Sequence, residues 1–311
     1  MKKWLSLLLL AALLLSGCGQ KRNARVAICL RSCADTVAAE RLETMRTAFT
    51  EAGFAVAAAD AEEDQSRQTR QIQDLPDEGY DLLVVEPVMQ EQAEEIAAMA
   101  KKARVPVIFI GYEPELESWE KACYIGARED AAGAAQPQVL QSLPDKGDLN
   151  GDGVITYAII AGPEDDMDAI AHTDACRKAL EQGSCLATVH TDWSKDAAAN
   201  ACKKLLADYG KDMEVIFCNS DTLAMGAMAA VREGGRVVNE TVYLVGLGGD
   251  FQARLLLRSG DLTGTVYLPA EELAQMLLDA AGKLLAGDPA QSSYGAYIPM
   301  TGDNVEDYIP Q

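Results

Sequence analysis

The chain has 311 residues, of which 49% are hydrophobic and 24% charged, and this composition excludes a disordered or fibrous protein. The length predicts about two domains. Lys and Arg number 27 against 48 Asp and Glu, so the formal net charge is −21. This charge argues against nucleic acid as a partner, because a surface that binds phosphate needs a basic patch.

The first segment is expected to be a targeting sequence and not part of the fold. Two lysines precede the apolar run Trp4–Leu15, which is shorter than the about 20 residues that a membrane-spanning helix needs. Such a run is typical of a secretory signal. The small residues that follow it, before Cys18, resemble a bacterial lipobox, which implies a lipid on that sulfur. We therefore expect a signal peptide at 1–17, a lipidated tether at 18–24 and anchoring to the cell membrane on its extracytoplasmic face.

Apart from Cys18, the chain has seven cysteines. No CxxC motif occurs and the chain has 2 histidines, so a zinc site is not expected. We expect reduced cysteines in the core, while a disulfide between Cys29 and Cys33 stays open. The cysteines in apolar segments, where a free thiol behaves as a small buried hydrophobic group, are Cys29, Cys123, Cys185 and Cys218.

Strands and helices alternate along the first half of the chain that follows. The helix expected at 37–52 carries apolar residues at helical spacing and stops at Gly53, a residue suited to a helix C-terminus. The alternation of strand and helix indicates a doubly wound parallel sheet. The expected strands are 25–30, 54–59, 82–85, 107–110 and 123–125, and the further helices are 67–78 and 90–103.

The same alternation of strands and helices begins again at Ile155, which indicates a second α/β lobe of similar design. Ligands of such sheets bind beyond the carboxyl ends of the strands, so we expect the site in the cleft between the two lobes. The expected strands are 155–161, 186–189, 215–218, 242–246 and 263–267, and the helices lie near 168–182, 195–209, 222–233, 251–259 and 271–286.

The strongest chemical motif runs from Asp148 to Thr156. Oxygen-bearing side chains stand at alternate positions, Asp148, Asn150 and Asp152, followed by a glycine and by a backbone carbonyl position at Val154. Calcium takes about six to eight oxygen ligands, and the glycine permits the tight bend that brings them together. The last position of such a loop holds no carboxylate here, so one acidic ligand must come from elsewhere. The alternative is a polar turn that binds no metal.

Three stretches give the chain a resemblance to a known family: residues 64–72, the loop at 148–156, and MEVIFCNSDTLAMG at 213–226. Over nearly all of its mature length the chain resembles the calcium-containing galactose/glucose-binding proteins of the type 1 periplasmic binding protein superfamily. The resemblance implies a structural Ca²⁺ in the loop, with Thr156 as a further ligand and Glu214 as the missing carboxylate.

The resemblance also implies how the two lobes are assembled. We expect two doubly wound parallel-sheet lobes joined by a three-strand hinge. The lobes are expected at 25–128 plus about 270–297, and at 129–269 plus about 298–311.

Family pockets bracket sugar hydroxyls with planar polar groups and stack aromatic rings on the sugar faces. Gly111 and Ser220 stand where the family has asparagine, and His172 stands where it has arginine, which changes the hydroxyls that the site can satisfy. Asp35 and Asp168 have an alternative role as acids at a helix N-terminus. The residues expected to bind the ligand are Asp35, Gly111, Tyr112, Asp168, His172, Trp193, Ser220 and Asp250.

The implied function is that of a lipid-anchored, monomeric solute-binding protein of an ABC uptake system. It would bind a monosaccharide, such as galactose, glucose or a related sugar, and deliver it to a membrane permease without any enzymatic turnover. A non-hexose ligand and a chemosensory role are alternatives. A sugar-responsive repressor would need a basic DNA-binding segment, which the charge of −21 opposes. A calcium-dependent glycosidase would need two carboxylates that flank a substrate, whereas Asp165, Asp166 and Asp168 cluster on one loop.

Overall fold

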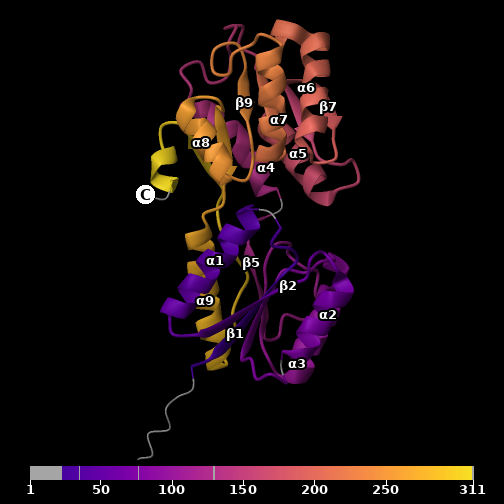
Figure 1. Ribbon diagram of the computed structural model, residues 1–311, viewed down its shortest axis with the longest axis vertical. Coiled ribbons are helices and arrows are strands. Elements are labelled where there is room, and N and C mark those ends of the chain that lie inside the picture. Colours follow the sequence, from indigo (N-terminus) through magenta and orange to yellow (C-terminus); the bar gives the residue numbers. More distant parts are fainter. Residues whose placement is uncertain (1–22, 35, 76, 129, 310–311) are drawn as a thin grey trace, which may run out of the picture.

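The computed structural model describes residues 23–309 except positions 35, 76 and 129. Two lobes follow one another along the long axis of the molecule, and each is a six-stranded sheet between two layers of helices (Figure 1). This arrangement confirms the predicted α/β fold with two doubly wound lobes. Within the described residues, no helix is both long and apolar enough to cross a membrane.

The first lobe contains the sheet β11-β5-β4-β3-β1-β2, in which every pairing is parallel. Helices α1 (Thr36–Glu51) and α9 (Ala270–Ala286) cover one face, and α2 (Gln65–Asp74) and α3 (Ala93–Ala103) cover the other. The strands are β1 (Arg25–Leu30), β2 (Ala55–Asp60), β3 (Leu82–Val85), β4 (Val107–Phe109), β5 (Ala122–Gly126) and β11 (Ser293–Tyr294).

The second lobe contains the sheet β12-β10-β9-β8-β6-β7, in which only β12 runs antiparallel, beside β10. Helices α6 (Lys195–Tyr209), α7 (Asp221–Glu233) and α8 (Phe251–Ser259) cover one face. The other face carries α4 (Ala131–Ala135), α5 (Met167–Ala179) and a 3₁₀ segment (Gln136–Ser142). The strands are β6 (Thr156–Ala161), β7 (Ser184–His190), β8 (Val215–Cys218), β9 (Tyr243–Val245), β10 (Gly264–Tyr267) and β12 (Ile298–Thr301).

The inner strands of both lobes bury residues on both faces, which explains their continuous apolar runs. In β1, Ile28 packs in the cluster that contains Phe49 of α1, while Cys29 packs in the cluster that contains Ile72 of α2. All of these side chains are at most 1% exposed. Neighbouring residues of β1 therefore pack against helices on opposite faces of the sheet.

The chain passes from one lobe to the other three times: after β5, between β10 and α9, and between β11 and β12. Each lobe is therefore built from segments that are distant in sequence. The short strand β11 and the segment from α4 to Ser142 were not expected, because two residues carry no strand pattern and a run rich in Ala and Gly carries little helical periodicity.

The seven cysteines among the described residues are all free. Cys29, Cys123 and Cys218 are buried, as expected. The expectation for Cys185 was wrong, because this residue is exposed. It lies on β7, the edge strand of its sheet, where the solvent side is left uncovered.

Candidate functional site

A cavity of about 210 Å³ lies between the two lobes. Residues of the first lobe that follow directly after strands line it: Arg31 after β1, Glu86 after β3, and Tyr112 shortly after β4. Asp168 and His172 of α5 line it from the second lobe. The remaining lining residues are Arg41, Gly111, Ile125, Gly126, Ala127, Arg128, Leu268, Leu273 and Tyr297.

The local structure explains why these side chains meet. The carboxyl ends of parallel strands lie at one edge of a sheet, so residues after β1, β3 and β4 reach the same place. In the second lobe, the Asp166 side chain caps α5 by accepting a hydrogen bond from the Ala169 N–H at 3.0 Å. Asp168 then lies in the first helical turn, and His172 lies four residues later on the same face.

The first lobe contributes an ion pair to the cavity wall. The Arg41 Nη2 donates to Glu86 Oε1 at 2.8 Å and to Oε2 at 2.9 Å. The backbone around this carboxylate is fixed by Gln68, a fully buried side chain whose Nε2 donates to the Glu86 carbonyl at 2.7 Å. Glu86 itself is only 7% exposed, so its charge acts in a poorly hydrated place.

Arg31 adds a second cation beside this pair. Burial lowers the pKa of Arg31, but Glu86, Tyr112 and Asp168 together raise that pKa above its ordinary value. The guanidinium therefore stays charged and offers several donors to whatever occupies the cavity.

A hydrogen bond crosses the cavity from one lobe to the other. The Tyr112 hydroxyl of the first lobe donates to Asp168 Oδ2 of the second. Burial, and then the negative charge of Asp168, raise the pKa of Tyr112, so the phenol remains a donor at neutral pH. The loop that carries Tyr112 is held by Tyr124, whose single hydroxyl proton is shared between the Gly111 carbonyl, at 2.7 Å, and the Ala127 carbonyl, at 2.9 Å.

His172 is a neutral group in this wall. Burial lowers the pKa of His172, although Asp168 and Asp166 act to raise it. Its buried Nδ1 has no hydrogen-bond partner among the described residues. The position of α5 is set by Gly133 of α4, where an added Cβ would lie 2.0 Å from the His172 carbonyl oxygen. Only glycine allows the two helices to approach so closely.

Three expected ligand residues do not line the cavity. Ser220 caps α7, since its Oγ accepts from the Leu223 N–H at 3.2 Å, and Asp250 caps α8 in the same way. Trp193 packs on Gly162 after β6, and its indole donates to Asp166 at 3.3 Å. Thus Gly111, Tyr112, Asp168 and His172 are brought together, whereas Trp193, Ser220 and Asp250 lie outside the lining. Asp35 and Cys18 lie outside the described residues.

Several residues that line the cavity were not predicted from the sequence. Arg31 and Glu86 directly follow apolar strands, so their position at strand ends could have indicated that they line the cleft. Arg41 lies on a helix, and Tyr297 lies on the return between β11 and β12. For these two, only the three-dimensional packing shows that they reach the cleft.

The loop at 148–156 folds around its own polar side chains. Asp148 Oδ2 accepts from the Gly153 N–H at 2.9 Å, Asn150 Oδ1 from the Asp152 N–H at 2.8 Å, and Asp152 Oδ1 from the Val154 N–H at 2.9 Å. These bonds hold the alternating oxygens in a tight turn. Each carboxylate keeps further lone pairs that can bind a cation.

Glu214 ties this loop to the start of β8. Its carboxylate accepts from the Asn150 N–H at 2.9 Å and from the Thr156 N–H at 2.8 Å, and the Glu214 residue is 2% exposed. The available donors are oxygens, which suits calcium chemistry. In the described part of the chain, however, three or more His, Cys, Asp or Glu side chains nowhere gather into a group that could hold a metal.

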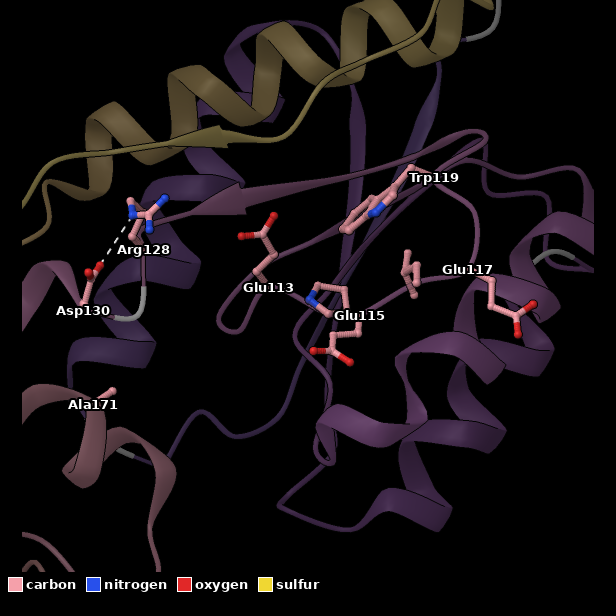
Figure 2. A pocket seen from close by; sticks show the side chains of 9 residues that line it. Glu113, Glu115, Glu117, Trp119, Arg128, Asp130 and Ala171 are labelled. Atoms are coloured by element: carbon pink, nitrogen blue, oxygen red, sulfur yellow. Dashed lines mark ion pairs between the residues drawn. The ribbon is translucent and has the colours of Figure 1, made fainter.

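A larger groove of about 960 Å³ opens beside the cavity and shares Arg128 with it. Figure 2 shows its acidic side chains, Glu113, Glu115 and Glu117, spread along a loop and pointing in different directions. Arg128 pairs with Asp130, Nε to Oδ1, at 3.5 Å. Because these groups converge on no common point, we assign the candidate site to the smaller cavity between the lobes.

Comparisons with known proteins find relatives of similar sequence. The sequence model of the family described as "Periplasmic binding protein domain" matches residues 26–289. A xylitol-binding protein of Mycolicibacterium smegmatis is 27% identical over 250 residues, which cover 79% of this chain and 68% of that protein. The D-galactose/methyl-galactoside binding periplasmic protein MglB of Haemophilus influenzae is 25% identical over 290 residues, with 86% of each chain covered.

Solved structures share the fold. An ABC transporter solute-binding protein from Bacillus halodurans with bound myo-inositol has a TM-score of 0.74 and 20% identity, covering 92% of this chain and 97% of its own. A periplasmic solute-binding protein from Actinobacillus succinogenes with bound D-allose has a TM-score of 0.78 and 15% identity, covering 92% and 100%.

Proposed function

The chain belongs to the periplasmic binding protein family, and from this we propose that it is the solute-binding component of an ABC uptake system for a monosaccharide or polyol. The observation that carries the proposal is the cavity between the lobes, because both lobes contribute polar side chains to it. The relatives and structural neighbours named above are described as binding proteins, which supports binding without turnover.

The chemistry of the lining suits a polyhydroxylated ligand. Asp168 and Glu86 offer carboxylate oxygens that accept from hydroxyls, and Arg31 offers donors to hydroxyl oxygens. Such charge-assisted hydrogen bonds are worth about 1.5–3 kcal/mol each. Tyr112 and Tyr297 supply aromatic surface for the apolar face of a sugar ring.

The size of the cavity narrows the ligand class. Its volume of about 210 Å³ is below the roughly 300–1,000 Å³ of sites for drug-sized ligands. We therefore propose a ligand of one ring or a short open chain, a class that includes galactose, glucose, xylitol and myo-inositol. A longer saccharide would not fit between closed lobes.

A thermal-unfolding screen tests this function. Xylitol, myo-inositol, D-galactose, D-glucose and D-ribose would each be added in excess, with sucrose as a control too large for the cavity. A ligand that binds only the folded protein raises the melting temperature. At least one of the five is expected to do so while sucrose does not. If none of the five shifts the melting temperature, the proposed ligand class is wrong.

We further propose that the loop at 148–156 binds a structural Ca²⁺. Asp148, Asn150, Asp152 and Thr156 would supply side-chain oxygens, Val154 its carbonyl, and Glu214 a carboxylate from the neighbouring strand. The support is the oxygen-only donor set and the hydrogen bonds that the Glu214 carboxylate accepts from the Asn150 and Thr156 N–H groups. The ion would neutralise acidic charge in the turn and fasten it to β8.

The lipid anchor at Cys18 remains part of the proposal. An anchored protein would present its closed lobes to a permease on the extracytoplasmic face of the membrane. Replacement of Cys18 by serine is expected to release the protein from the membrane fraction or to leave its precursor unprocessed. An unchanged mass and an unchanged membrane fraction would show that Cys18 carries no lipid.

A further inference from the structure

An ion pair joins the two lobes at a place apart from the cavity. Arg254 of α8, in the second lobe, lies with Nη2 at 3.4 Å from Glu40 Oε2 of α1, in the first lobe. Neither residue lines the cavity. In Figure 1, one end of α1 reaches the boundary with the second lobe, and α8 lies in the second lobe on the other side of that boundary.

Arg254 is held rigidly by its own lobe. Its Nε donates to the Gly249 carbonyl at 2.7 Å, and its Nη1 donates to the Tyr308 carbonyl at 2.8 Å. The guanidinium carbon lies 5.0 Å from the centre of the Tyr267 ring. The side chain of Arg254 is only 9% exposed. The N–H donors of Arg254 are therefore already oriented before the first lobe approaches.

Because Arg254 is already ordered, less side-chain entropy is lost when the ion pair with Glu40 forms. Exposed ion pairs are weak because both flexible side chains must be ordered when they meet. Here the guanidinium is ordered in advance, and only the Glu40 side chain, which is 46% exposed, has to be fixed. A pre-oriented guanidinium loses less entropy for each bond that it makes.

We propose that Glu40 and Arg254 form a latch that stabilises the closed arrangement of the lobes and thereby raises the affinity for the ligand. Any rotation that separates α1 from α8 breaks this contact, while Arg254 keeps its bonds to Gly249 and Tyr308. A contact present in the closed state alone shifts the population toward closure, and the apparent affinity rises with it. Both are positioning residues, and the effect on affinity rests on the proposed function.

The test compares Glu40→Gln with Glu43→Gln. Glu43 lies on the same helix and pairs with Arg46 of that helix at 3.5 Å, so it is a matched control that does not bridge the lobes. We expect Glu40→Gln to weaken binding of the polyol found in the screen about two- to fivefold, mainly through faster dissociation. Glu43→Gln should bind like the wild type. The difference between Glu40→Gln and the wild type should shrink in about 1 M salt, because salt screens the pair.

A second measurement needs no ligand. Small-angle X-ray scattering at low salt should give a larger radius of gyration for ligand-free Glu40→Gln than for the wild type, with Glu43→Gln unchanged. If the wild type binds no polyol, the ligand proposal fails, and scattering alone decides on the latch. If Glu40→Gln matches Glu43→Gln in every measurement made, the latch is overturned.

Discussion

The Asp168 carboxylate has three roles. It occupies the first turn of α5, where a helix dipole favours negative charge, and it accepts the Tyr112 hydroxyl from the other lobe. Its cavity position then makes it available to ligand hydroxyls. The sequence indicated the first and third roles. The second could not be predicted, because it depends on how the two lobes face each other.

Removal of the Asp168 carboxylate should reduce ligand affinity most. Asp168→Ala is expected to weaken binding by about tenfold to a hundredfold, since charge-assisted bonds to hydroxyls are lost. Asp174→Ala is the matched control, because Asp174 lies on the same helix but is exposed. Titration calorimetry measures both. Equal affinities for the two variants would move the ligand away from α5.

Asp221 gives the stability of the protein a pH dependence. The residue is 2% exposed; Thr265 Oγ1 donates to its Oδ1 at 2.6 Å, and the Asp250 N–H donates to its Oδ2 at 2.9 Å. Burial, and then the charge of Asp250, raise the pKa of Asp221 from 3.8 to about 7, against the lowering effect of these hydrogen bonds. Between about pH 4 and pH 7 the folded protein therefore binds more protons than the unfolded chain.

The free energy of unfolding should therefore fall as the pH rises through that window, by at most about 1.4 kcal/mol per pH unit from this group. Asp221→Asn removes the titration. Denaturant unfolding at pH 5 and pH 7 should show a larger loss of stability with rising pH in the wild type than in Asp221→Asn. The same pH dependence in both proteins would mean that the Asp221 pKa is not raised.

At the scale of elements, the alternation of strands and helices predicted most of both sheets. Apolar runs such as Leu82–Val85 are visible in sequence because the inner strands are buried on both faces. The segment after β5 was not visible, because α4 is only five residues long and its packing depends on a close approach at Gly133. Strand ends also pointed to the cleft, yet the sequence alone did not show which of them carry ligand-facing side chains.

The contact between α4 and α5 can be tested with two alanine substitutions. Gly133→Ala would place a Cβ 2.0 Å from the His172 carbonyl oxygen, so a destabilisation of roughly 1–3 kcal/mol is expected from overpacking. Gly282 lies inside α9, and an added Cβ there meets nothing within 4 Å. Gly282→Ala should instead stabilise the protein by roughly 0.5–1 kcal/mol. Chemical denaturation measures both, and a neutral Gly133→Ala would contradict the packing described.

The loop at 148–156 gives a second prediction at this scale. If it binds Ca²⁺, a chelator should lower the melting temperature, because the ion binds the folded protein. Glu214→Gln should weaken the response to calcium, whereas Glu240→Gln, an exposed acid of the same lobe, should not. No heat of calcium binding in calorimetry, together with no effect of the chelator, would favour the polar turn that binds no metal.

In the molecule as a whole, three passages of the chain connect the two lobes. They leave the lobes joined at the segments after β5, after β10 and after β11, so that the cavity is formed by two bodies and belongs to neither alone. Contacts such as Tyr112 with Asp168 and Glu40 with Arg254 exist only when these bodies meet. Sequence patterns predict the elements of each lobe, but they do not predict which residues of the two lobes contact each other.

The proposed function requires a small polyol to bind between the lobes. A crystal structure of the protein with the ligand that raises the melting temperature most would show where that ligand binds. We expect density for one small polyhydroxylated molecule in the cavity, with its hydroxyls in contact with Arg31, Glu86 and Asp168. Density in the acidic groove of Figure 2, or a ligand bound to one lobe alone, would show that the ligand does not bind between the lobes.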